Sequence, residues 1–270
     1  MTVLLSFAIE AARDAGTALL ARFEGDFEVE TKSSAVDLVT TADREAEALI
    51  VDRIRANFPD HAILAEEGGA IVGDDAPASG IQWIIDPLDG TTNFAHGIPH
   101  FCVSIAMWEG GQPRVGVVHD PCRNETFFAH RGHGAVLETP RGPHRHLAVR
   151  GGDRLNDALL ATGFAYHRGQ GGPDNLAELC RMVPRIRGIR RAGSAALDLA
   201  YVAAGRLDGY WEHSLSPWDT AAGALLVAEA GGVMSRIDGG PWTPWERSVV
   251  AVGPALRDPL LAALAEAPRP

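Results

Sequence analysis

The chain has 270 residues, of which 46% are hydrophobic, and its formal net charge at pH 7 is -11. This length and composition allow a sizeable core, built as one large domain or as two closely packed ones. The negative charge argues against a nucleic-acid-binding surface, and no stretch is apolar for the length that a membrane span requires.

The cysteines and the N-terminal residues bear on the compartment. Cys102, Cys122 and Cys180 are odd in number, widely spaced and without a C-x-x-C pair. They match neither a disulfide framework nor a zinc knuckle. Residues 1–24 lack the basic start and apolar run of a signal peptide. We therefore expect a cytoplasmic protein.

In the first half of the chain, apolar residues recur at helical and then at strand spacing. The spacing predicts helices over residues 3–23 and 41–58, short strands over 62–65 and 81–85, and an antiparallel meander over 101–149. This half is therefore predicted to be α+β.

After Asp153 the pattern changes to alternating strands and helices, which is typical of an α/β arrangement. The predicted strands cover residues 158–161, 186–189 and 208–211, and the predicted helices cover 174–182 and 194–204. Gly151-Gly152 is a modest break in composition and not a flexible linker. We expect residues 1–150 and 151–270 to be two halves of one compact unit.

Residues 83–94 read Trp-Ile-Ile-Asp-Pro-Leu-Asp-Gly-Thr-Thr-Asn-Phe, so Asp86 and Asp89 follow a buried strand. Pro87 is predicted to end the strand and turn the chain at Asp86. Two bare carboxylates about 4 Å apart repel by roughly 4 kcal/mol at an effective dielectric near 20, so a site that gathers them implies a proton or a cation. A hard divalent cation is the favoured occupant.

The residues after Asp89 suit a phosphate group. Gly90 lets the backbone approach a ligand closely, and Thr91, Thr92 and Asn93 are predicted to open a helix. Free amides and the dipole at such a helix start favour a phosphate oxygen. Metal and phosphate are thus expected to meet at one turn.

Residues 86–94 resemble a signature of the inositol monophosphatase family of magnesium-dependent phosphatases. A second element, residues 218–232, resembles the other signature of that family, and shorter elements lie at 37–43, 65–67 and 190–196. The resemblance spans about residues 30 to 235. It implies a layered α-β-α-β-α sandwich of the inositol monophosphatase and fructose-1,6-bisphosphatase type. The first half would bind metal and phosphate, and the second would complete the metal and substrate site.

The resemblance also implies a metal set for two to three magnesium ions. Glu66, Asp86 and the backbone carbonyl of Leu88 would hold one ion. Asp86 would bridge to a second ion held with Asp89 and Asp219, and Glu66 would also contact a weak third. Taken alone, Asp219 after Ser216-Pro217 also fits an ordinary acid at a helix start.

Catalysis would require an oriented water molecule. The resemblance implies that the Thr91 hydroxyl accepts from this water and donates to Asp43, while Glu66 accepts the water's proton. The local sequence by itself makes Asp43 a first-turn helix acid after Thr40. Lys32 is either a loop cation near the ions or an ordinary surface lysine.

Substrate recognition is assigned in two parts. Asp89, Gly90, Thr91 and Thr92 would line the phosphate end. By resemblance, Glu212 binds polyol hydroxyls, although an ordinary loop acid stays open. The remaining predicted substrate residues are the helix opening Gly193-Ser194-Ala195 and, from the basic run before it, Arg190.

The implied activity is magnesium-dependent hydrolysis of myo-inositol monophosphate to inositol and phosphate, with lithium inhibition and a homodimer. A broader sugar-phosphate phosphatase, acting on fructose 1,6-bisphosphate, and a histidinol-phosphate phosphatase are the alternatives. Branches acting on histidinol phosphate usually carry lysine where this chain has Thr92, which favours inositol. The loop at residues 166–169 bears on this choice.

An alternative of another class is a binding role. A bacterial relative that resembles this chain, notably over residues 191–205, joins transcription antitermination complexes. A protein partner of that kind is therefore a second hypothesis, beside a small phosphorylated polyol as substrate.

Overall fold

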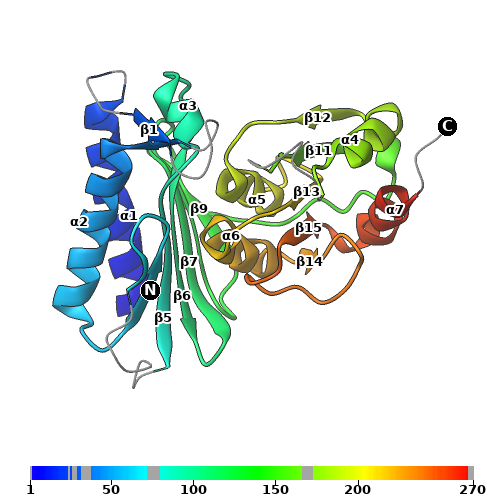
Figure 1. The fold of residues 1–270 in the computed structure, drawn as a ribbon. Coiled ribbons are helices and arrows are strands. Elements are labelled where there is room, and N and C mark those ends of the chain that lie inside the picture. Colours follow the sequence, from blue (N-terminus) through cyan, green and yellow to red (C-terminus); the bar gives the residue numbers. More distant parts are fainter. Residues whose placement is uncertain are drawn as a thin grey trace.

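Helices and sheets alternate in five layers, α-β-α-β-α, in the computed structural model of the chain (Figure 1). The structure describes residues 2–23, 25, 29–31, 38–71, 80–165 and 173–266. The layered sandwich, with an α+β first half and an α/β second half, is confirmed. Lys32 and the loop at residues 166–169 lie outside the described residues.

The helices follow the apolar spacing and the capping residues of the sequence. They are α1 (Val3–Arg22), α2 (Thr41–Asn57), α3 (Thr91–Ala95), α4 (Leu176–Met182), α5 (Ala195–Ala203), α6 (Pro217–Glu229) and α7 (Pro254–Ala265), with 3₁₀ turns at Leu155–Asp157 and Val183–Arg185. Two of these helices, α2 and α6, begin with capping boxes, which satisfy backbone N–H groups at the helix start.

Two large sheets and one small ribbon contain the strands. The ribbon pairs β1 (Val29–Thr31) with β2 (Leu38–Thr40). The first sheet runs in the order β10-β9-β8-β7-β6-β5-β3-β4, and the second in the order β12-β11-β13-β15-β14. Their bounds are β3 Ala62–Ala65, β4 Gly69–Ile71, β5 Ile81–Asp89, β6 Cys102–Glu109, β7 Gln112–Asp120, β8 Glu125–His130, β9 Ala135–Glu138, β10 Arg145–His146, β11 Leu159–Thr162, β12 Gly188–Arg190, β13 Gly209–His213, β14 Val233–Ser235 and β15 Ser248–Val252.

The sheets differ in direction. The meander predicted over residues 101–149 is present as the antiparallel strands β6 to β10. In the second sheet, β11 runs parallel to β12 and β13, as strand-helix alternation predicts, whereas β15 pairs antiparallel with β13 and β14. The sequence patterns did not predict β14, β15 or α7.

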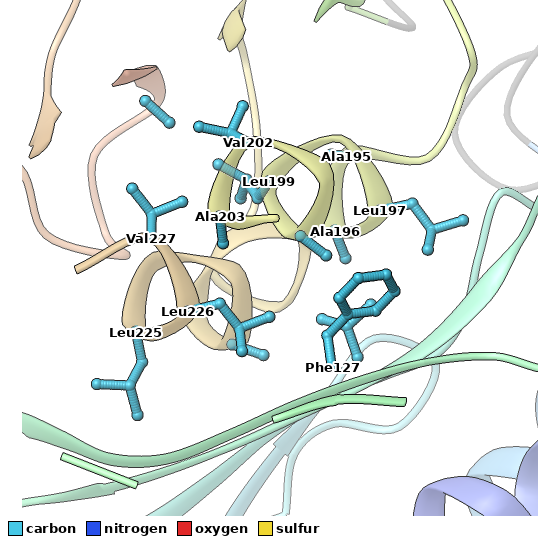
Figure 2. Packing of buried hydrophobic residues seen from close by; sticks show 14 of the residues in the cluster. Phe127, Ala195, Ala196, Leu197, Leu199, Val202, Ala203, Leu225, Leu226 and Val227 are labelled. Atoms are coloured by element: carbon cyan, nitrogen blue, oxygen red, sulfur yellow. The ribbon is translucent and has the colours of Figure 1, made fainter. Parts of the chain in front are cut away.

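Three apolar cores join the layers. α1 and α2 cover one face of the first sheet, α5 and α6 lie between the two sheets, and α7 packs on the far face of the second (Figure 1). Figure 2 shows Phe127 of β8 pointing from the first sheet toward Ala196 and Leu197 on α5. The middle core therefore unites residues from both halves of the chain.

A glycine brings α6 close to the first sheet. A Cβ at Gly116 on β7 would lie 2.7 Å from the backbone oxygen of Ala222 on α6, so only glycine allows this approach. The start of α6, which carries Asp219, is thereby held over the strands that carry Asp86 and Asp89.

The end of β5 differs from the prediction. The strand continues through Pro87 to Asp89, and its pairing with β6 shifts register between Asp86 and Asp89. The expectation that Pro87 ends the strand is wrong, because an irregular stretch of the ladder does not need the N–H that proline lacks. The chain turns instead at Gly90, whose φ is 106°.

Candidate active site

Four carboxylates meet where β5 ends: Glu66, Asp86, Asp89 and Asp219. β3 and β5 run parallel with Ala65 opposite Ile85, so Glu66 leaves β3 at the edge where Asp86 stands. The Glu66 N–H donates to the carbonyl of Ile85 at 3.2 Å. Asp86 is 1% exposed and Asp89 is 9% exposed.

These carboxylates repel one another in the folded chain. Burial raises the pKa of Asp86 well above its usual range, and the charges of Glu66, Asp89 and Asp219 raise it further. Burial and the charge of Glu66 also raise the pKa of Asp219. A gathered set of buried carboxylates is the donor chemistry that magnesium prefers, so these residues fit the predicted ion.

Each aspartate is oriented by the backbone. Asp86 Oδ1 accepts from the Leu88 N–H at 3.0 Å, and Asp219 Oδ2 accepts from the Ser216 N–H at 2.7 Å. Asp219 is therefore both a cap of α6 and a member of the cluster. Within the described residues, no three His, Cys, Asp or Glu side chains lie in the geometry of an assembled metal cage. Asp86 and Asp219 nevertheless lie near enough to the other carboxylates for those charges to raise their pKa values.

Thr91 connects this cluster to α2. Its hydroxyl lies 3.1 Å from Asp43 Oδ1 and 3.1 Å from the carbonyl oxygen of Leu88. The hydroxyl has one proton and both neighbours are acceptors, so it donates here and keeps lone pairs that can accept from a water molecule. The Leu88 carbonyl, which is a predicted metal ligand, has a second lone pair left for an ion.

Asp43 makes the contacts that both readings of it require. Its Oδ2 accepts from the Thr40 N–H at 2.8 Å and from the Thr40 hydroxyl at 2.5 Å, which caps α2. Its Oδ1 faces Thr91 at the same time. Burial raises the pKa of Asp43, which is fully buried, while the Thr40 bonds lower it.

Groups at the start of α5 donate hydrogen bonds to Asp89. The Asp89 carboxylate accepts from the Ser194 hydroxyl at 2.6 Å, from the Ala196 N–H at 2.7 Å and from the Ala195 N–H at 3.3 Å. Ser194 is 2% exposed, so its hydroxyl orients Asp89. Asp89 thus connects the carboxylate cluster to the start of α5, which was predicted to bind the substrate.

A pocket opens beside these residues. Its lining is Asp89, Thr92, Thr162, Gly163, Phe164, Ala165, Arg191, Gly193, Ser194, Ala195, Asp198, Glu212, Ser214, Leu215 and Asp219. The pocket thus brings together most of the predicted substrate residues, from the end of β5, α3, the start of α5 and β13. Gly90 caps α3 at the turn and does not line the pocket.

Glu212 reaches this pocket from β13. Its carboxylate accepts from the Tyr210 hydroxyl at 2.5 Å. A Cβ at position 163 would overlap the Glu212 carboxylate, so glycine at that position makes room for it. Burial raises the pKa of Glu212 to about 7.

The structure corrects the arginine prediction. Arg190 is exposed, and its guanidinium donates to the carbonyl of Ile189 at 3.0 Å, whereas Arg191 lines the pocket. Neighbouring residues in extended backbone point to opposite sides, so a shift of one position along the chain decides which arginine faces the pocket. The charge of Arg191 lowers the pKa of Glu212, against the effect of burial.

Asp198 is a pocket residue that the sequence patterns did not single out. It is 3% exposed and lies four residues after Ser194, on the same face of α5. A lone acid within the apolar helix Ala195–Ala203 was the signal available in the sequence.

The inositol monophosphatase family model matches residues 1–269. The chain belongs to this family. Membership implies phosphatase activity, in a family that is generally metal-dependent. The resemblance inferred from the two signatures is therefore confirmed. Within the described residues, no helix combines the length and the apolarity needed to span a membrane.

Similar proteins cover nearly the whole chain. A Nus factor SuhB of Salmonella typhimurium is 44% identical over 265 residues, covering 97% of this chain and 96% of its own. An inositol-1-monophosphatase of Synechocystis sp. is 44% identical over 265 residues, covering 98% of this chain and 90% of its own. The solved structure of extragenic suppressor protein suhB from Bartonella henselae has a TM-score of 0.90 and 40% identity, covering 98% of this chain and 99% of that one.

Proposed function

We propose that this protein is a magnesium-dependent phosphatase that hydrolyses myo-inositol monophosphate to inositol and phosphate. The observation that carries the proposal is the convergence of four carboxylates beside the Thr91 and Asp43 pair. The adjoining pocket is lined by the acidic side chains of Glu212 and Asp198.

Glu66, Asp86, the Leu88 carbonyl, Asp89 and Asp219 would hold the ions. When bound, magnesium neutralises charge on the phosphoryl oxygens and acidifies a coordinated water. Thr91 orients the attacking water, because its hydroxyl donates toward Asp43 and can accept from the water. Glu66 takes the water's proton.

The leaving group is assigned to the pocket. Glu212 faces it from β13, and Thr92 lines its rim from α3. A carboxylate accepts hydrogen bonds from ring hydroxyls, which suits a polyol phosphate. A threonine at position 92, in place of a lysine, supports inositol phosphate over histidinol phosphate.

The proposal is tested by phosphate release from inositol 1-phosphate, histidinol phosphate, fructose 1,6-bisphosphate and a nucleotide 3'-phosphate. Each substrate is assayed with magnesium, with EDTA and with added lithium. We expect magnesium-dependent preference for inositol 1-phosphate and inhibition by lithium. Metal-dependent preference for another substrate would replace inositol in the proposal, and no activity on any of them would refute it.

A second candidate function is a Nus-factor role. It is supported by the Salmonella relative, which bears that name at 44% identity over 97% of this chain. The test is a pull-down of transcription proteins with wild type and with Asp89→Asn. A partner retained by an inactive variant would separate this role from catalysis, and capture of no transcription protein would refute it.

A further inference from the structure

Asp198 lines the pocket beside the carboxylate cluster. Its backbone N–H donates to the Ser194 carbonyl at 3.0 Å, so both side chains belong to one face of α5, and both line the pocket. Asp198 is 3% exposed. Among the described residues, no donor pairs with its carboxylate.

The neighbouring acids are paired. Asp89 accepts from Ser194 and from two backbone N–H groups, and Glu212 accepts from Tyr210. A largely buried carboxylate without a protein donor takes its hydrogen bonds from pocket water or from a bound ligand. The Asp198 carboxylate is therefore available to a ligand that enters the pocket. Burial and the charge of Glu212 accordingly raise the pKa of Asp198 well above its usual range.

The charges around the pocket select the kind of ligand. Arg191 lines the same pocket, and its positive charge lowers the pKa of both Asp198 and Glu212. An amine on the leaving group would be attracted by the two carboxylates but repelled by this guanidinium, and an acid would be repelled by the two carboxylates. Neutral hydroxyls, which donate to a carboxylate and accept from a guanidinium, satisfy all three side chains.

We propose that Asp198 is a specificity-determining residue that, with Glu212, accepts hydrogen bonds from neighbouring hydroxyls of a neutral polyol leaving group. The two acceptors reach the pocket from separate elements, α5 and β13, which suits a ring that presents more than one hydroxyl. This inference rests on the proposed function and narrows the substrate class to esters of vicinal diols.

The test compares two substrates within each variant. Wild type, Asp198→Ala and Asp198→Asn are assayed on inositol 1-phosphate and on 4-nitrophenyl phosphate, whose leaving group has no neighbouring hydroxyl. The control is Asp157→Asn, which removes an exposed carboxylate that pairs with Arg187. Because each variant is its own reference, partial misfolding cancels from the ratio of the two activities.

We expect Asp198→Ala to lower kcat/KM for inositol 1-phosphate by about 10-fold to 100-fold, mainly through KM. Its activity on 4-nitrophenyl phosphate should change less than about twofold, Asp198→Asn should recover part of the loss, and Asp157→Asn should resemble wild type. Parallel losses on both substrates would overturn the inference, since a metal ligand or a purely structural residue affects both. So would an unchanged KM for inositol 1-phosphate. A wild type that cleaves only 4-nitrophenyl phosphate would instead refute the proposed function, and this inference with it.

Discussion

The metal end and the substrate end of this site are built differently. At the metal end, Asp86 and Asp89 come from one strand end, and the Leu88 N–H next to them orients Asp86. Only the orientation of Asp89 depends on a distant element, the start of α5. At the substrate end, Arg191, Asp198 and Glu212 come from three separate places and are brought together only by packing. The metal end can therefore be predicted from a local sequence motif, whereas the residues of the substrate end come together only in the folded chain.

The largest effect should come from Asp86→Asn at the metal end. We expect phosphatase activity to fall by about 1000-fold, because in the proposed site Asp86 would be a ligand of both ions. In EDTA the same variant should unfold at a higher temperature than wild type, since repulsion from Glu66, Asp89 and Asp219 is relieved.

Activity assays and thermal denaturation check both parts of this prediction. Asp52→Asn, on the exposed face of α2, is the control and should leave activity and stability near the wild-type values. Full activity in Asp86→Asn would remove the metal assignment at the end of β5.

Thr91→Ala should lower kcat by about 100-fold with little change in KM, because the hydroxyl between Asp43 and the water is lost. Thr91→Ser keeps the hydroxyl and is the matched control. Steady-state kinetics separate the two variants. Equal losses in both would mean that the methyl group packing, and not the hydroxyl, is what matters.

Glu212 makes stability depend on pH at the substrate end. The pKa of Glu212 rises from 4.5 to about 7 on folding. The contribution of the protonated side chain to the free energy of unfolding is therefore fully present below pH 4.5 and is lost as the pH rises through 7. Metal-free wild type should therefore lose up to about 3 kcal/mol relative to Glu212→Gln between pH 5 and pH 8. Urea unfolding in EDTA at four pH values measures this difference. A difference that does not change with pH would contradict the burial of an ionisable Glu212.

The smallest effect tests the two neighbouring arginines. Arg191→Ala should raise KM for inositol 1-phosphate about fivefold, because one donor and one charge leave the pocket. Arg190→Ala, one residue away and exposed, should stay within about twofold of wild type. A larger increase in KM for Arg190→Ala than for Arg191→Ala would instead support the sequence-based prediction that Arg190 binds the substrate.

Sequence patterns were sufficient where the cause is local. Apolar spacing predicted α1, α2 and the meander, and the pair of capping residues around Pro217 marked the start of α6. The same patterns failed at Pro87, where a register shift lets β5 continue, and at β14, β15 and α7. Those outcomes depend on which strand pairs with the segment in the folded protein, and the sequence of one segment does not identify its pairing partner.

By itself, the sequence determined the family and the carboxylates that end β5, because short motifs carry that information locally, and the resemblance to the family implied the layered fold. Only the tertiary structure decided that Arg191 and not Arg190 faces the pocket, that Ser194 is used to orient Asp89, and that no donor in the described part of the chain pairs with the Asp198 carboxylate. Each of these facts is set by contacts between elements far apart in the chain. Direction and pairing of side chains are properties of the packed molecule.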